Sequence, residues 1–203
     1  MAENKIFTLP KLPYGYGDLE PYISEEQLRI HHQKHHQAYV DKANLLLEKM
    51  DKARKENSDL DMKSILKDFS FQLSGHILHS LFWDNIKPGV ELNNPLGDLK
   101  DAIDKNFGSI QRFKTEFAQA ALSVEGSGWA VLTYLAEVER MAIIQIEKHN
   151  ANILPCLPAI LVLDVFEHAY YLDYKNDRAR FIEQFWYLVD WEEADKRFLK
   201  IVK

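Results

Sequence analysis

Residues 24–50 read SEEQLRIHHQKHHQAYVDKANLLLEKM and contain neither glycine nor proline. Ser24, followed three residues later by Gln27, matches a capping box, in which the serine caps a helix and the glutamine bonds back to it. Apolar side chains then recur at helical spacing as far as Met50. The stretch therefore predicts a long helix over residues 25–54.

A second helix is predicted over residues 62–83, where apolar side chains recur at the same spacing. The short polar segment 55–61 joins it to the first helix, so the two form an antiparallel hairpin. Gly75 lies inside the second helix, where glycine costs about 1 kcal/mol relative to alanine. We therefore expect a packing or site-related reason for it.

The linker Lys87–Pro95 suggests a boundary between two domains, a helical hairpin over 1–90 and an α/β lobe over 91–203. The predicted elements of the second domain are helices at 98–106, 109–122, 178–189 and 191–200, and strands at 129–138, 142–147 and 159–165. The fold class is therefore α+β, a long antiparallel helical hairpin followed by a lobe with a small three-stranded antiparallel sheet.

Composition argues against several classes of protein. The 203 residues are 46% hydrophobic, and the net charge of −6 provides no attraction to nucleic acid or to an anionic membrane. The single cysteine, Cys156, can form no intrachain disulfide and is expected to be a small buried side chain. Residues 1–10 lack the apolar core of a signal peptide, and no apolar run reaches the ~18 residues that span a membrane. We expect a cytoplasmic protein.

The eight histidines are confined to four places in the chain, and this clustering suggests a function. They are His31, His32, His35 and His36; His76 and His79; His149; and His168. Residues four apart share a helix face, so His31 pairs with His35 and His32 with His36. We expect one of these faces to meet the second helix and the other to meet solvent. The simpler alternative is a solvated polar helix face.

Two further positions offer ligands to the same site. His79 lies on the apolar second helix, where a lone histidine is commonly a hydrogen-bonded core residue, but the hairpin can bring it opposite the first cluster. Asp164 follows a buried strand, and a buried acid is costly unless it is paired or binds a cation. His168 is four residues further on and can point to the same place. The alternative is that Asp164 simply caps a helix.

Three imidazoles and one carboxylate suit iron, manganese or zinc. A second cysteine and the motif HExxH are both missing, and so is any Glu-x-x-His, which argues against structural zinc, zinc protease and di-iron sites. The spacing predicts a mononuclear site built from both domains, and leaves open which clustered histidine binds. It also leaves open a non-haem iron oxygenase and a metal-binding module without turnover.

Several motifs, taken in order, resemble the iron/manganese superoxide dismutase family over nearly the whole length. They are Leu9–Tyr14, His31–Val40, His79–Trp83, Gly126–Trp129, Asp164–Tyr171, Phe185–Trp186 and Asp190–Trp191. The resemblance implies one iron or manganese ion per chain, bound by His31, His79, Asp164, His168 and a water or hydroxide. It also implies the reaction, in which superoxide is converted to oxygen and hydrogen peroxide by redox cycling of the ion.

The resemblance assigns further roles near the metal. Tyr39 would be a hydrogen-bonding gate, with His35 behind it and linked to Tyr171 of the partner subunit. Glu167 would reach across a two-fold axis to the ligand His168 of the partner subunit. The implied assembly is a homodimer, which can pair into a tetramer of two dimers.

Three positions depart from the family pattern. A glutamine usually donates near the metal from one of two positions, which here hold Gly75 and His149. His149 is thus the expected donor, and the choice between iron and manganese stays open. Phe166 stands where tryptophan is usual, and His76 has no assigned role beyond a polar contact.

Overall fold

The structure is a computed structural model that describes residues 6–91, 93–154 and 158–202, so the expected burial of Cys156 lies outside the described residues. The α-helices are α1 (Glu25–Ile30), α2 (Gln37–Glu56), α3 (Met62–Asp84), α4 (Gly97–Phe107), α5 (Ile110–Leu122), α6 (Tyr171–Tyr174), α7 (Arg178–Leu188) and α8 (Trp191–Val202). The strands are β1 (Gly128–Leu135), β2 (Arg140–Glu147) and β3 (Ala159–Asp164). The fold confirms the predicted α+β class, with a helical hairpin followed by an α/β lobe.

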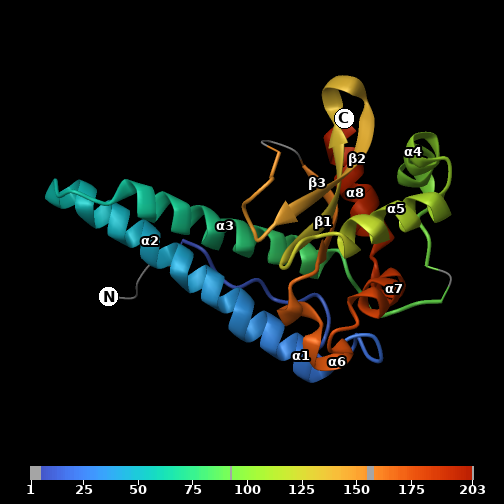
Figure 1. Ribbon diagram of the computed structural model, residues 1–203, viewed down its shortest axis with the longest axis horizontal. Helices are drawn as coiled ribbons and strands as arrows, with labels where there is room; N and C mark the ends of the chain where they lie inside the picture. Colours follow the sequence, from blue (N-terminus) through green and yellow to red (C-terminus); the bar gives the residue numbers. More distant parts are fainter. Residues whose placement is uncertain (1–5, 92, 155–157, 203) are drawn as a thin grey trace.

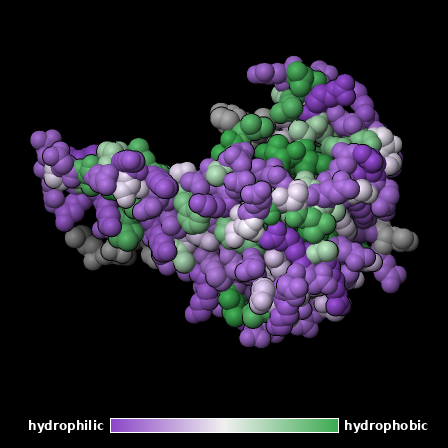
Figure 2. Space-filling view, in the orientation of Figure 1, coloured by the Kyte–Doolittle hydropathy of each residue, from purple (hydrophilic) through white to green (hydrophobic). Residues whose placement is uncertain are grey.

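The long first helix forms as predicted but is not uniform. Its middle turn, η1 (His31–His36), is a π-helix that joins α1 to α2, and the run ends at Asn57 with φ of 50°. Helix α3 returns along α2, and the far end of this hairpin projects away from the rest of the molecule (Figure 1). The surface of this projecting part is mostly hydrophilic (Figure 2). Among the described residues, none of the helices combines the length and the apolar character that crossing a membrane requires.

The sheet has the order β2-β1-β3, and both pairs are antiparallel. Trp129 on β1 is directly opposite Asp164 on β3, so the two side chains lie on the same face of the sheet. The predicted strand 129–138 was three residues too long, because Ala136–Val138 form a 3₁₀ turn that leads into Glu139 at φ of 51°. The register therefore places an indole beside the acid at the end of β3.

The end of α3 is fixed against the sheet by a buried hydrogen bond. The N–H of Val162 in β3 donates to the Oδ1 atom of Asn85, just after α3, over 2.8 Å. Phe82 and Trp83, at the end of α3, lie in the same apolar core as the sheet. This docking brings His79, one turn earlier on α3, to the end of β3.

Candidate metal centre

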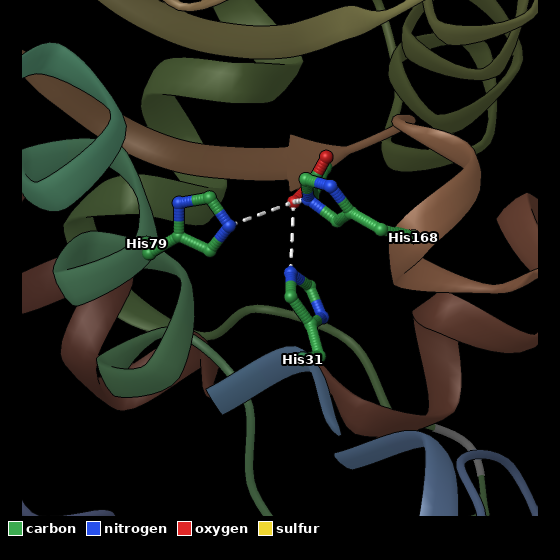
Figure 3. A group of neighbouring side chains, drawn as sticks. His31, His79 and His168 are labelled. Atoms are coloured by element: carbon green, nitrogen blue, oxygen red, sulfur yellow. Dashed lines mark hydrogen bonds and ion pairs between the residues drawn. The ribbon is translucent and has the colours of Figure 1, made fainter. Parts of the chain in front are cut away.

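Three histidines from three different elements surround one carboxylate oxygen. The Nε2 atoms of His31 on η1 and His168 on the 3₁₀ helix η3 (Glu167–Ala169) lie 3.0 Å and 3.1 Å from Oδ2 of Asp164. The Nε2 atom of His79 on α3 lies 3.4 Å from the same oxygen. Figure 3 shows the three rings pointing toward one place. The four donor atoms lie within 4.8 Å of one another, so the group could hold one metal ion.

The hydrogen bonds of His79 and Asp164 fit a cation at this position. The Nδ1 atom of His79 lies 2.6 Å from the carbonyl of Gly75, which can only accept, so Nδ1 carries the proton in the neutral ring. Its Nε2 atom is then a lone-pair donor, buried and without a hydrogen-bond partner among the described residues. A lone pair facing a carboxylate oxygen is repulsive unless a cation lies between them. The donor chemistry therefore fits iron or manganese.

Burial and charge set the protonation states of this group. Burial lowers the pKa of His31 to about 4, although its hydrogen bond with Asp164 opposes the shift. Burial also lowers the pKa of His79 well below its ordinary value. For Asp164, burial raises the pKa, but the charge and hydrogen bonds of His168 and His31 outweigh it and hold the pKa well below its ordinary value. Ionised carboxylate and neutral imidazole are the forms that bind metals.

The second oxygen of Asp164 anchors the carboxylate. Its Oδ1 atom accepts from the N–H of Phe166 over 2.9 Å, in the turn that follows β3. The chain therefore turns after Asp164, and this turn brings His168 to the carboxylate, as expected from their spacing. Because the hydrogen bond from Phe166 holds Oδ1, the Oδ2 atom is the oxygen that is directed at the three histidines.

The histidine cluster on η1 divides as predicted, with one correction. The rings of His31 and His35 both contact the ring of His168, at centroid distances of 4.9 Å and 4.5 Å. His32 and His36 share the other face, but the expectation that one face meets solvent is wrong, because both are buried. The N-terminal segment covers His32, whose ring bonds to the carbonyl of Pro10 and lies 2.9 Å from the hydroxyl of Tyr16.

His36 and His76 form a hydrogen-bonded chain that the sequence did not reveal. The indole N–H of Trp83 donates to Nδ1 of His36, so the Nε2 atom of His36 carries the proton and donates to Nδ1 of His76. Burial lowers the pKa of His36 to about 2, which keeps this ring neutral. His76 thus makes a polar contact. No local sequence pattern predicts this series of hydrogen bonds, because Trp83 and His36 are 47 residues apart.

His149 is fully buried beside the candidate metal centre and is hydrogen-bonded to Trp129. Its Nδ1 atom accepts from the indole N–H of Trp129 over 3.0 Å. Its ring lies 5.6 Å from that of His79 and 4.7 Å from that of Tyr39, measured between centroids. The predicted donor therefore lies next to both a candidate ligand and the candidate gate.

The structure gives a site-related reason for a glycine at position 75 of helix α3. A Cβ atom there would lie 3.0 Å from the ring of Tyr39 and 3.3 Å from Cδ2 of His149. Burial raises the pKa of Tyr39 above its ordinary value, with a further contribution from the charge of Asp164. The missing side chain therefore leaves room for Tyr39 and His149 together.

Phe166 fills the position where tryptophan is usual. Its ring stacks on His149 at 4.3 Å and on His168 at 4.8 Å. Trp83 packs edge-on against His31, and Trp129 packs edge-on against His79. Aromatic rings therefore line the candidate centre on several sides, and Phe166 is one of them.

Tyr171 and Glu167, which were predicted to face a partner, lie on the outside of this segment. Tyr171 is 46% exposed, and Glu167 is exposed although it precedes the half-buried His168. Among the described residues of this single chain, Tyr171 is not in contact with His35, and the link between subunits stays a prediction.

The fold and the site together are those of a mononuclear metalloprotein, with candidate ligands that come from a helical hairpin and from an α/β lobe. The sequence model of the iron/manganese superoxide dismutase alpha-hairpin domain matches residues 6–87, and that of the C-terminal domain matches residues 95–197. The chain belongs to the iron/manganese superoxide dismutase family.

Named relatives support the same family over nearly the whole chain. Superoxide dismutase (Fe) of Methanothermobacter thermautotrophicus is 55% identical over 201 residues, which cover 98% of each chain. The protein of the same name from Pyrobaculum aerophilum is 50% identical over 98% of this chain and 95% of its own. Superoxide dismutase (Mn/Fe) of Aeropyrum pernix is 47% identical over 97% of this chain and 92% of its own.

Proposed function

We propose that this protein is a superoxide dismutase that converts superoxide to oxygen and hydrogen peroxide with one iron or manganese ion. The observation that carries the proposal is the convergence of three imidazole Nε2 atoms on one oxygen of the buried Asp164. We propose His31, His79, Asp164 and His168 as the ligands. When bound, the ion supplies one-electron redox chemistry.

The protein groups around the centre have three tasks in this reaction. The carboxylate and three neutral imidazoles contribute a single negative charge, which leaves the cation with net positive charge toward an anionic substrate. Trp83, Trp129 and Phe166 restrict the space next to the ligands to small molecules. Hydrogen-bond donors must then hold the substrate and deliver protons.

We propose His149 and Tyr39 as those donors, with His35 and Tyr171 as further members of the proton network. His149 supports this role because its Nδ1 atom accepts from Trp129, which leaves the proton on Nε2. The ring of Tyr39 contacts the rings of both His79 and His149, at centroid distances of 5.1 Å and 4.7 Å. A donor fixed in this way needs no reorientation when superoxide arrives.

The test is removal of superoxide by protein loaded separately with iron, with manganese and with zinc. The iron or the manganese form should catalyse dismutation, whereas the zinc form should bind its redox-inert ion and stay inactive. Tight binding without turnover in all three forms would favour a metal-binding module. Oxygen consumption that depends on an organic co-substrate would favour an oxygenase.

We propose that the active form is a homodimer in which Glu167 contacts His168 of the partner subunit. The exposed Glu167, Tyr171 and Leu172, all adjacent to the candidate ligand segment, support this assembly. A carboxylate on the outer side of the ligand histidine would fix its orientation. Two such dimers can associate into a tetramer.

The domain boundary and the cellular location are also proposals. We propose a hairpin domain over 1–90 and an α/β domain over 91–203, supported by the family matches that end at residue 87 and begin at residue 95. We propose a cytoplasmic location, supported by the single cysteine, which can form no intrachain disulfide. Cell fractionation with an antibody tests this location.

A further inference from the structure

Gln27 on α1 is a buried polar residue whose side chain crosses to the other domain. It is 1% exposed. Its Nε2 atom donates to the backbone carbonyl of His168 over 2.6 Å, and its Oε1 atom accepts from the N–H of Leu172 over 3.2 Å. Both of these backbone groups belong to the segment that carries a proposed metal ligand. One side-chain amide therefore bonds twice to the chain around His168.

The two groups that Gln27 contacts are four residues apart, and in a continuous α-helix they would bond to each other. The helix is broken here, because Tyr170 separates η3 from α6 with φ of −144° and ψ of −13°. The N–H of Tyr170 bonds back to Glu167 and that of Tyr174 to Tyr170, on either side of the gap. The amide of Gln27 thus fills a gap in the hydrogen-bond ladder and satisfies two backbone groups.

A second contact makes the junction reciprocal. In a capping box, the side chain of Gln27 would bond to the N–H of Ser24. Instead, that N–H donates to Oδ2 of Asp173 on α6 over 2.8 Å, while Ser24 still accepts from the backbone N–H of Gln27. Helix α6 thus supplies a cap for α1, and α1 supplies the missing partner for α6. The two helices lie side by side (Figure 1).

We propose that Gln27 is a positioning residue of the metal centre, which holds the main chain of His168 so that its imidazole stays at Asp164. The inference rests on the proposed function, since it assumes that His168 is a ligand. Helices η3 and α6 span three and four residues, too short to be rigid alone. Gln27 connects this segment to α1, which leads directly into η1 and the other proposed ligand, His31.

The test replaces Gln27 with methionine, which has similar length and lacks both polar atoms. Gln27→Met should release bound iron or manganese to a chelator about 10-fold faster than the wild type, the low end of the effect of groups that orient ligands. The visible absorption of the bound metal should also shift, because the orientation of His168 changes. Gln111→Met, on the exposed face of α5, is the matched control and should change neither property.

A milder variant keeps the test valid if Gln27→Met does not fold. Gln27→Asn retains both polar atoms but is one methylene shorter, so it cannot reach both backbone groups. It should release metal several-fold faster than the wild type. Wild-type release rates and spectra in both variants, even with lower melting temperatures, would mean that Gln27 only supports the fold, and would overturn the inference.

Hydrogen exchange separates failure of this inference from failure of the proposed function. Backbone amides of residues 166–174, measured in metal-free protein, should exchange faster in Gln27→Met than in the wild type. If the wild type binds no metal yet exchange accelerates, the proposed function fails and the role of Gln27 in holding this segment stands. Unchanged exchange in this segment would overturn the inference whatever the metal content.

Discussion

The indole N–H of Trp129 donates to Nδ1 of His149 over 3.0 Å and thereby fixes which nitrogen of this histidine carries a proton. The neutral ring must then be protonated at Nε2, which is buried and has no hydrogen-bond partner among the described residues. Burial lowers the pKa of His149 to about 4, so the ring is neutral near pH 7. A buried N–H without a partner is costly, and a small ligand at the adjacent centre would satisfy it.

Replacing His149 with glutamine should retain the metal and alter the catalysis. The amide is also a donor, but it has different reach and cannot be protonated, so the ratio of activities with iron and with manganese should change about 10-fold or more. Metal content and activity with each ion are the measurements. Identical activity with both metals, together with an unchanged pH profile, would contradict the proposed role of His149.

Asp164→Ala should abolish metal retention. Asp164 is the fully buried acid to which three imidazoles converge, and its loss removes the only negative charge among the proposed ligands. His79→Ala should have the same effect, because its Nε2 atom is one of the four donor atoms. Metal analysis after dialysis checks both variants. A variant with full metal content and activity would remove that residue from the proposed ligands.

Gly75→Ala should lower activity more than it lowers stability. The new Cβ atom would press on the ring of Tyr39 at 3.0 Å and on His149 at 3.3 Å, so both proposed donors must shift. Helix propensity alone favours alanine by about 1 kcal/mol, which offsets part of the strain. We expect an activity loss of about 10-fold with metal content near that of the wild type. Unchanged catalysis would show that the two rings can move without consequence.

Metal-free protein should lose stability as the pH falls from about 6.5 to about 4. Burial lowers the pKa of His31 and His149 from 6.5 to about 4, so the unfolded chain binds their protons first. Each should contribute a slope of up to about 1.4 kcal/mol per pH unit in this window. Asp164 has a lowered pKa and loses its contribution only below 3.8. Urea unfolding of the wild type and of His149→Gln measures the slope, which should be smaller in the variant.

Glu167→Ala should weaken the dimer and lower activity together. Glu167 is exposed in the single chain, so its removal should cost little in folding. Sedimentation over a range of concentrations, with activity measured on the same samples, checks the prediction. Glu183→Ala, at an exposed position of α7, is a suitable control. A fully active, metal-loaded monomer would contradict the proposal that the site is completed by the partner.

The sequence predicted the helices and strands well because their periodicity is local. It predicted less well the features that depend on contacts between residues far apart in the sequence. The π-helical turn at His31–His36 contains no apolar residue that would mark it as buried. Three of its histidines are buried because the N-terminal segment and α3 pack against them. Gln27 has a local partner in the capping box, but its side chain instead bonds to His168, 141 residues away. The hydrogen-bonded series that runs from Trp83 through His36 to His76 also has no local sequence pattern that would predict it.

The positions of His31 and Asp164, 133 residues apart in the chain, also bear on the order of assembly. Contacts of such long range form late, because the chain must first close a large loop. We therefore expect the four donor atoms to come together only after both halves of the protein have largely folded and docked. An ion captured at that moment stabilises the native state by mass action, and the stabilisation grows with the logarithm of its free concentration. Since three imidazoles and one carboxylate suit both iron and manganese, we expect the supply of metal during folding to select the ion that becomes resident.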